Sequence, residues 1–369
     1  MIMRSNWKSV GVGVAVAVAW IGSGLVAVQA ASEAEVTDFL ARIQSDQGAT
    51  RVDAIIKAGP MGAAAVVPLG QVAGGDNREA SIAAQRALRN IAAYAGRPEA
   101  EAGQRKAVAE ALTRILDQQY SKVTRCLALD LLSITGNDAV VPKIDALLHD
   151  SDGDVADEAR RSLEGIPGSA SLKALIDGAG KAQGRLRLAI FTSLGQRAAP
   201  EAAEVLIAAT ESPDTEVVLE ALDALARIGI AKDDRVKMPS WDGLNESQQA
   251  RMANSWLRWA DQRAVKGAVE DALEVYRMVF DNAQSEHLIC AALIGAAKAA
   301  PEPAFEYVVR ALGRDENTVR MVAVRILEQS PGDDAKIGKL LDAYRNAKPD
   351  TRELIIRVLN AWNSKKLAL

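Results

Sequence analysis

The chain has few of the side chains on which metal binding and catalysis usually depend. Its 369 residues include two histidines, His149 and His287, and two cysteines, Cys126 and Cys290. A zinc site takes three or four ligands at short local spacing, and only His287 and Cys290, three residues apart, come near such a pattern. Both cysteines fall within apolar helical patterns, so we expect two unpaired thiols that pack as small apolar side chains.

Other catalytic patterns are missing as well. A serine or cysteine nucleophile needs a base beside it, and both histidines fall in predicted turn regions. Asp150, Asp152 and Asp154 alternate as in a calcium loop, but the closing position carries Arg161 in place of glutamate. We therefore expect no catalytic residue, no metal and no cofactor, and we predict that the protein is not an enzyme.

The chain also lacks an excess of positive charge. Its formal net charge is −4, and removal of an N-terminal segment that carries Arg4 and Lys8 and no acidic residue leaves −6. An acidic protein does not attract nucleic acid or anionic lipid unless a basic patch is segregated on one face. We therefore expect no nucleic-acid partner.

Residues 1–30 have the order of charges and apolar residues that is typical of an export signal. Arg4 and Lys8 precede the uncharged stretch Val10–Val28, and small residues lead up to Ala30. We predict cleavage after Ala30, which gives a periplasmic or secreted protein without stable membrane insertion. The rival interpretation is an uncleaved anchor, because nineteen apolar residues nearly span a bilayer.

Aromatic residues make up only 4% of the chain, whereas alanine recurs throughout, as close helix packing requires. Apolar residues at offsets 0, 4, 8 and 11 form one stripe on a helix. The stripe recurs in four complete copies: Ala80, Ala84, Leu88 and Ile91; Val123, Leu127, Leu131 and Ile134; Val155, Ala159, Leu163 and Ile166; and Val217, Ala221, Leu225 and Ile228.

The spacing of the stripes indicates a repeat. Stripes that begin at positions 123, 155, 186 and 217 are separated by 32, 31 and 31 residues, and those at 288 and 319 by 31. Each stripe ends at a glycine or proline, and a shorter apolar helix follows. Two antiparallel helices in each period predict an all-α protein, an αα-superhelix of about seven to eight helix pairs.

The junction Ile134–Pro142 resembles the inter-repeat junction of bacterial HEAT repeats of the phycobilisome-lyase HEAT-like type. The resemblance covers about 33–362 and implies a HEAT/armadillo-type solenoid. The arginine usual one residue after the first apolar position of the stripe is present as Arg187 and Arg320 and is replaced elsewhere. Related repeats in chromophore lyases cradle a bilin, which makes a lyase-like enzyme a third interpretation of function.

About forty extra residues interrupt the repeat between 217 and 288. Trp256, Gly267, Ala272 and Tyr276 resemble a tetratricopeptide repeat, although Trp259 stands where leucine is usual. We predict a signal peptide at 1–30, N-terminal HEAT-like repeats at 31–229, a linker with a tetratricopeptide-like helix pair at 230–282, and C-terminal HEAT-like repeats at 283–369.

In HEAT arrays the second helix of each pair lines the concave face, so stripe offsets 2, 6 and 9 are candidates for a binding surface. These offsets place arginines in the N-terminal part and leucines in the middle, and the predicted binding residues are Arg86, Arg89, Arg125, Arg161, Leu188 and Leu219. Arginines would hold an acidic segment while leucines take its apolar side chains. The alternative is that the leucines are buried between repeats and the arginines are ordinary solvated residues.

We therefore expect an exported scaffold that binds a protein partner on its concave face. The alternative is an accessory module that docks an exported enzyme or its polymeric substrate.

Overall fold

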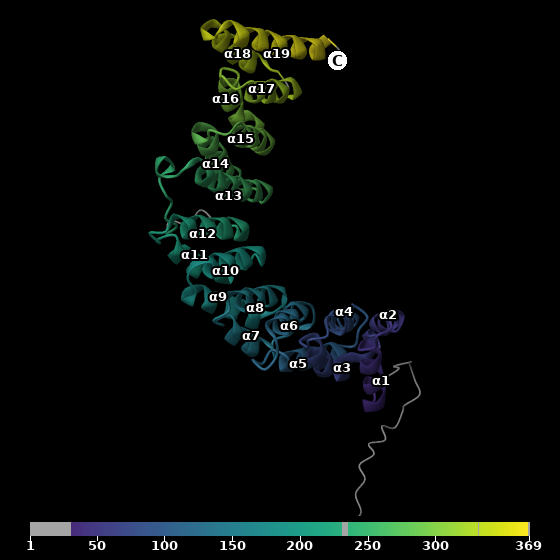
Figure 1. Ribbon diagram of the computed structural model, residues 1–369. Coiled ribbons are helices and arrows are strands. Elements are labelled where there is room, and N and C mark those ends of the chain that lie inside the picture. Colours follow the sequence, from purple (N-terminus) through teal and green to yellow (C-terminus); the bar gives the residue numbers. More distant parts are fainter. Residues whose placement is uncertain (1–30, 231–234, 331, 368–369) are drawn as a thin grey trace, which may run out of the picture.

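The computed structural model describes residues 31–230, 235–330 and 332–367, and the predicted signal peptide lies outside these ranges. The described residues form helices and no strands. The helices stack in two layers into a curved array (Figure 1). The predicted αα-superhelix is therefore confirmed.

One layer follows the convex side of the array in Figure 1 and is called the outer layer here. Its helices are α1 (Glu33–Ile43), α3 (Gly62–Ala73), α5 (Ala102–Arg114), α7 (Val141–Leu147), α9 (Ser169–Lys181), α11 (Ala203–Ala209), α14 (Val269–Asn282), α16 (Pro301–Ala311) and α18 (Asp334–Asn346). Short 3₁₀ turns at Gly59–Met61, Pro200–Ala202 and Trp241–Gly243 join some of the elements.

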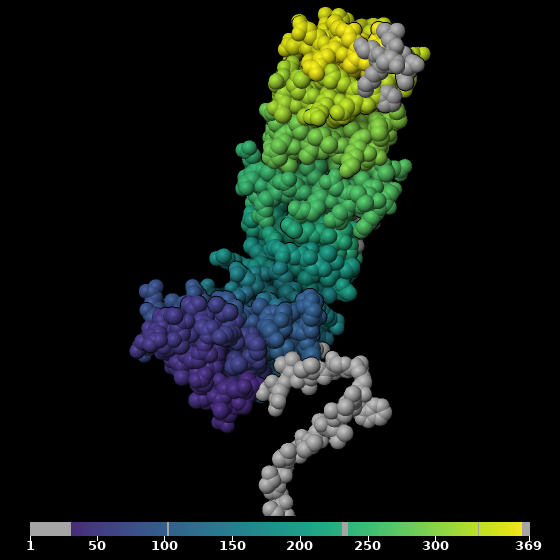
Figure 2. Space-filling model, turned by 90° about the vertical axis from the view of Figure 1, so that its right-hand side faces the viewer, coloured from purple at the N-terminus to yellow at the C-terminus, as the bar shows by residue number. Residues whose placement is uncertain are grey.

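The other layer follows the concave side and is called the inner layer (Figure 1). Its helices are α2 (Gly48–Ile56), α4 (Arg78–Ala95), α6 (Lys122–Thr135), α8 (Gly153–Gly165), α10 (Gly184–Gln196), α12 (Thr215–Ile228), α13 (Glu246–Val265), α15 (Glu286–Ala299), α17 (Asn317–Gln329) and α19 (Pro349–Leu367). Figure 2 looks into this side, with the C-terminal repeats as a column and the N-terminal repeats projecting at its base.

Polar side chains cap the N-termini of several inner helices. The side chains of Asn77, Asp152 and Asp214 accept hydrogen bonds from backbone N–H groups in the first turns of α4, α8 and α12. Helix α12 ends at Gly229, whose φ of 91° is a left-handed conformation that favours glycine. Side-chain caps therefore mark where α4, α8 and α12 begin, and Gly229 marks where α12 ends.

Apolar side chains between the layers form two large clusters. The first extends from α1 to α12, and the second begins at Ala226 and extends to Trp362 in α19. The predicted stripe of α8, from Val155 through Leu163 to Ile166, is fully buried in the first cluster. The clusters meet at α12 and α13, which makes this junction the boundary between two cores.

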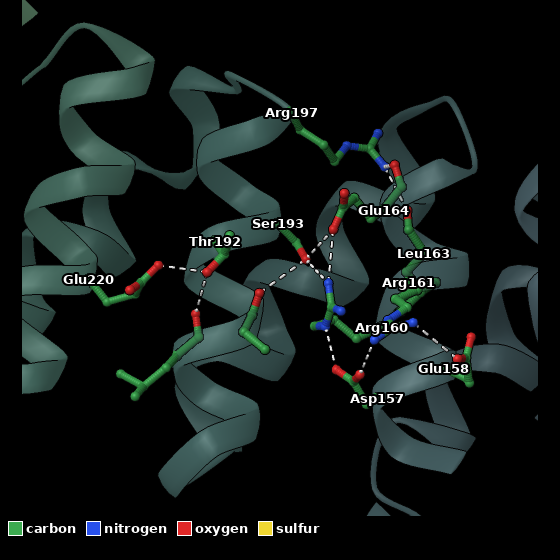
Figure 3. Close-up of polar contacts among 12 residues, drawn as sticks. Asp157, Glu158, Arg160, Arg161, Leu163, Glu164, Thr192, Ser193, Arg197 and Glu220 are labelled. Carbon is green, nitrogen blue, oxygen red and sulfur yellow. Dashed lines mark hydrogen bonds and ion pairs between the residues drawn. The ribbon is translucent and has the colours of Figure 1, made fainter. Parts of the chain in front are cut away.

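Arginines connect neighbouring repeats in the first core (Figure 3). The buried guanidinium of Arg160 donates to Asp157, to Glu164 and, at 2.6 Å, to Ser193 Oγ on the next inner helix. Arg197 donates to the carbonyl oxygens of Leu163, Ile166 and Gly168 at 2.8 to 2.9 Å, and so satisfies carbonyl groups at the end of α8. Successive repeats are therefore held by directed hydrogen bonds as well as by apolar packing.

The extra residues after α12 build one repeat without an outer helix. Arg235 pairs with Glu204 of α11, and the backbone N–H of Lys237 donates to Thr210. This segment therefore lies against α11, where the next outer helix would stand, and α13 continues the inner layer. Helix α14 returns to the outer layer, because Arg310 of α16 pairs with Asp281 of α14.

Candidate functional site

The inner layer presents most of the apolar side chains that remain exposed. Of the eleven large apolar residues exposed in the described part of the chain, nine lie on inner helices, whereas α18 and the segment after α12 carry one each. The nine are Val52, Ile56, Ile82, Val123, Ile134, Val265, Ile294, Met321 and Ile356. Scattered exposed apolar residues are ordinary, but their concentration on one layer is typical of an interaction surface.

At the N-terminal end, three of these residues lie near the starts of adjacent helices. Val52 on α2, Ile82 on α4 and Val123 on α6 all fall within the first two helical turns. The three helices pack side by side, so their N-terminal turns form one edge of the inner layer. We call these three residues the N-terminal apolar edge.

A groove of about 660 Å³ begins at Val123 and crosses α4, α6, α8 and α10. Cys126 and Leu127 contribute apolar surface to it. Its charged lining alternates in sign and comprises the cations Arg89, Lys122, Arg161 and Arg185 and the acids Asp130, Asp154, Asp157 and Glu158.

Some of these charges are paired within the groove. Lys122 lies 2.9 Å from Asp152 and also pairs with Asp154, and Arg161 lies 3.1 Å from Asp157 and 3.3 Å from Glu158. Arg89 and Arg185 form no ion pair with another described residue. The groove therefore offers two guanidinium groups and the carboxylate of Asp130 without ion pairs to described residues, beside apolar surface.

Burial shapes the titration of two groups in this groove. It raises the pKa of Glu158, and the nearby Asp130 adds to the shift while Arg161 opposes it. Burial also raises the pKa of the Cys126 thiol above its usual value. A thiol with a raised pKa is a weak nucleophile, because the thiolate is the reactive form.

Three of the four predicted arginines lie on the inner layer as exposed side chains. These are Arg86 and Arg89 on α4 and Arg161 on α8. The expectation that Arg125 joins them is wrong. Its buried guanidinium donates to the Leu116 carbonyl at 3.1 Å and pairs with Asp150 at 2.5 Å.

The burial of Arg125 follows from the orientation of α6. Val123 and Ile134, the ends of the predicted stripe, are 56% and 51% exposed, whereas Leu129 is buried. Two hydrogen bonds hold the pKa of Asp150 below its usual value. The stronger effect comes from the Asp152 N–H and the next from Arg125. Helix α6 is thus rotated so that Arg125 reaches this carboxylate.

The predicted apolar patch in the middle of the face is not present. Leu219 is only 2% exposed, because Leu244 and Met252 from the segment after α12 and from α13 pack around it. Leu188 is half-buried and packs against the first core. The exposed apolar residues lie towards the two ends of the inner layer instead.

The middle of the inner layer is polar and internally paired. Arg251 of α13 pairs with Glu216 and Glu220 of α12, and Arg258 pairs with Asp223. This arrangement separates the N-terminal apolar edge from a second exposed apolar region on α13 to α19.

That second region includes a groove of about 640 Å³ between α13 and α15. Val265 and Ile294 lie in it, together with Ala264, Ala291 and Lys298. Neither Val265 nor Ile294 is among the predicted binding residues. The sequence does carry a signal for Ile294. It is an apolar residue six positions after Leu288, and it lies outside the apolar stripe that begins there.

Within the described residues, no group of three or more His, Cys, Asp or Glu side chains is placed to hold a metal ion. His287 Nδ1 lies 2.6 Å from Ser285 Oγ, and both cysteines are free thiols. No single described helix is long and apolar enough to cross a membrane; one bent pair, Gly48–Ile56 with Gly59–Ala73, meets the length and composition of a span.

No known protein family matches the sequence, and no curated protein matches it. Among solved structures, yeast importin-beta (Kap95p) is 12% identical with a TM-score of 0.51, and the alignment covers 89% of this chain and 52% of that one. A second importin-beta structure is 12% identical with a TM-score of 0.46, covering 88% and 50%. This chain therefore spans about half the length of these importin-beta chains.

The complex of CpcE and CpcF of phycocyanin lyase from Nostoc sp. PCC7120 is 16% identical with a TM-score of 0.31, covering 61% of this chain and 94% of that one. At these identities the likeness concerns the fold alone. The chain has the fold of a helical HEAT-repeat solenoid.

Proposed function

We propose that the protein is an exported scaffold that binds a protein partner on its inner layer. The observation that carries the proposal is the concentration of exposed apolar side chains on the inner helices, nine of eleven in the described residues. Exposed apolar side chains are the usual core of a protein interface, and arginine is enriched beside them.

The N-terminal half of this face is the proposed contact surface. The N-terminal apolar edge supplies apolar area. Positive charge comes from Arg86, Arg89 and Arg185, which form no ion pairs with described residues. A partner segment with acidic and apolar side chains complements this combination, and its association would slow as salt rises.

Export is part of the proposal and rests on the sequence. Arg4 and Lys8, the apolar stretch Val10–Val28 and the small residues before Ala30 occur in the order of a cleaved signal. The protein then carries out its binding in the periplasm or outside the cell.

The helix pair α13–α14 carries the tetratricopeptide-like residues, and we propose that it serves packing. Ala272 and Tyr276 are at most 2% exposed, and Trp259 is 1% exposed. These three side chains are therefore part of the second core.

The test is affinity purification of the tagged full chain from its own cell envelope, with two variants beside it. We expect the recovered chain to begin at Ala31 and to bring down one protein in stoichiometric amount. Ile82→Asp with Val123→Asp should reduce its recovery at least tenfold, because two charges would face its apolar side chains. The matched control is Leu341→Asp, an exposed apolar residue of the outer layer.

Equal recovery by the Ile82 and Val123 double variant and by the Leu341 variant would refute binding at the N-terminal half. A recovered chain that begins at Met1 and stays in the membrane would refute cleavage. If the partner is a hydrolase or an oxidoreductase, the scaffold acts as an accessory module of that enzyme.

A further inference from the structure

We infer that the C-terminal half of the inner layer holds a second docking site, which takes an amphipathic α-helix with acidic residues beside its apolar ones. The inference rests on the proposed function, since it assigns a partner's helix to the inner layer. It concerns a region that the paired charges of α12 and α13 separate from the N-terminal apolar edge.

The anchor of the site is the groove between α13 and α15. Val265 is 87% exposed and Ile294 is 51% exposed, and alanines line the space between them. The groove volume of about 640 Å³ accommodates several apolar side chains of a partner. Burial of both residues removes from water the two most exposed large apolar side chains of this half, which favours binding.

The floor of this groove is fixed in shape. The ring of Tyr276 packs directly beneath Gly295, so that a Cβ at this position would lie 2.4 Å from the ring. The Tyr276 hydroxyl donates to Asp261 at 2.6 Å, which holds the ring in place. A floor of a fixed aromatic ring and a glycine is suited to a partner helix, because little side-chain entropy is lost there on binding.

The repeat sets the spacing of a row that crosses three inner helices. Ile294, Arg325 and Ile356 follow one another at intervals of 31 residues, and they lie on α15, α17 and α19. Ion pairs between α17 and α19, Arg320 with Asp350 and Arg357 with Glu328, show that these helices run parallel. The row therefore reads apolar, basic, apolar across the face.

This spacing matches an α-helix laid across the array. Packed helices lie about 8–10 Å apart, and seven residues of an α-helix advance about 10.5 Å. A helix across the inner layer would thus place every seventh residue over successive inner helices. Apolar residues would meet Ile294 and Ile356, and an acidic residue between them would meet Arg325.

Charge selects an acidic helix. Lys298 in the groove and Arg325 on α17 are exposed and form no ion pair with another described residue. Asp261 also lines the groove and keeps its negative charge while it accepts the Tyr276 hydroxyl, so Lys298 and Arg325 outnumber it two to one. A second copy of this chain in a symmetric contact would set Lys298 and Arg325 against the same cations, so a partner of opposite charge fits better.

The experiment is selection of a phage-displayed library of helical peptides on the full mature chain, followed by affinity measurement with synthetic forms of the enriched peptides. We expect enriched sequences to carry apolar residues fourteen apart with an acidic residue midway. Ile294→Glu should weaken their binding at least tenfold. Arg325→Glu should also weaken it, and should remove most of its salt dependence.

The control is Ile82→Glu, an exposed apolar residue at the other end of the inner layer, which should leave the peptide affinity unchanged. Circular dichroism melts of each variant confirm that the fold is retained. Peptides that bind Ile294→Glu as well as the parent chain, or no enriched acidic helix, would overturn the inference. A concentration-dependent dimer that Ile294→Glu abolishes would overturn it too, since a second copy would then be the occupant.

The two proposals fail separately. If Ile82→Glu and not Ile294→Glu abolishes peptide binding, the C-terminal site is wrong and binding by the inner layer stands. If neither substitution affects the peptides and the envelope partner is also insensitive to the N-terminal variants, the inner layer is not the binding face.

Discussion

Replacement of Leu163 by aspartate is expected to unfold the N-terminal core, with a loss of at least about 4 kcal/mol of unfolding free energy. Leu163 is fully buried on α8 in the apolar stripe of Val155 and Ile166. The guanidinium of the nearby Arg197 is already bonded to backbone carbonyl oxygens at the end of α8. Each repeat of a solenoid contacts its neighbours, so the damage should extend to α6 and α10. Urea unfolding followed by far-ultraviolet circular dichroism measures the loss.

The control for this variant is Leu341→Asp, because Leu341 is 42% exposed on α18. An exposed substitution of this kind should change the unfolding free energy by less than about 0.5 kcal/mol. Equal unfolding midpoints for the parent chain and Leu163→Asp would mean that the predicted register of α8 is wrong.

Replacement of Asp223 by alanine is expected to separate the unfolding of the two cores. Asp223 on α12 accepts hydrogen bonds from Ser255 at 2.8 Å and Arg258 at 2.6 Å on α13, and from Arg227 at 2.8 Å. Loss of the carboxylate removes the contacts of Ser255 and Arg258 across the boundary, while the ion pairs of Arg251 with Glu216 and Glu220 remain. The partly exposed Arg258 then lacks its partner, and the expected cost is about 2 kcal/mol. Calorimetry should then resolve two transitions where the parent chain shows one.

The same junction should weaken in acid. Burial alone would raise the pKa of Asp223, but hydrogen bonds from Arg227 and Ser255 and the charge of Arg258 hold it below the usual value. A carboxyl group whose pKa is lower in the folded than in the unfolded state stabilises the fold at pH values above its unfolded pKa. This contribution is lost as the pH falls through the folded pKa. The unfolding free energy should therefore decrease as the pH is lowered below about 4. The decrease should be smaller in Asp223→Ala than in the parent chain. A single transition in this variant, with the parent's pH dependence, would contradict the role of the junction.

The fold was predictable because its signal is repeated. Each buried stripe, as in Val155 to Ile166, ends at a breaker and returns after about 31 residues, so errors in one helix do not alter the architecture. The structure of the extra residues after α12 could not be predicted in the same way. An extended segment held by Glu204 and Thr210 takes the place of an outer helix, and no local pattern announces that substitution.

The binding residues were only partly predictable, because exposure depends on the rotation of each helix. Stripe offsets place Arg86 and Arg161 correctly on the inner layer. The offsets fail for Arg125, which is buried and donates a hydrogen bond to Asp150, twenty-five residues further along the chain. They also fail for Leu219, which is covered by Leu244 and Met252. These are contacts between distant segments, and helical periodicity carries no information about them.

The most direct test of the inner layer as the binding face is photo-crosslinking in the living host, with a photoreactive amino acid at single positions. Val123 and Ile294 represent the inner layer, and Lys173 on α9 and Leu341 on α18 represent the outer layer, all four exposed. The inner positions should yield a discrete adduct of defined mass, and the outer positions none. Adducts at Lys173 and Leu341 with none at Val123 and Ile294 would contradict binding by the concave side.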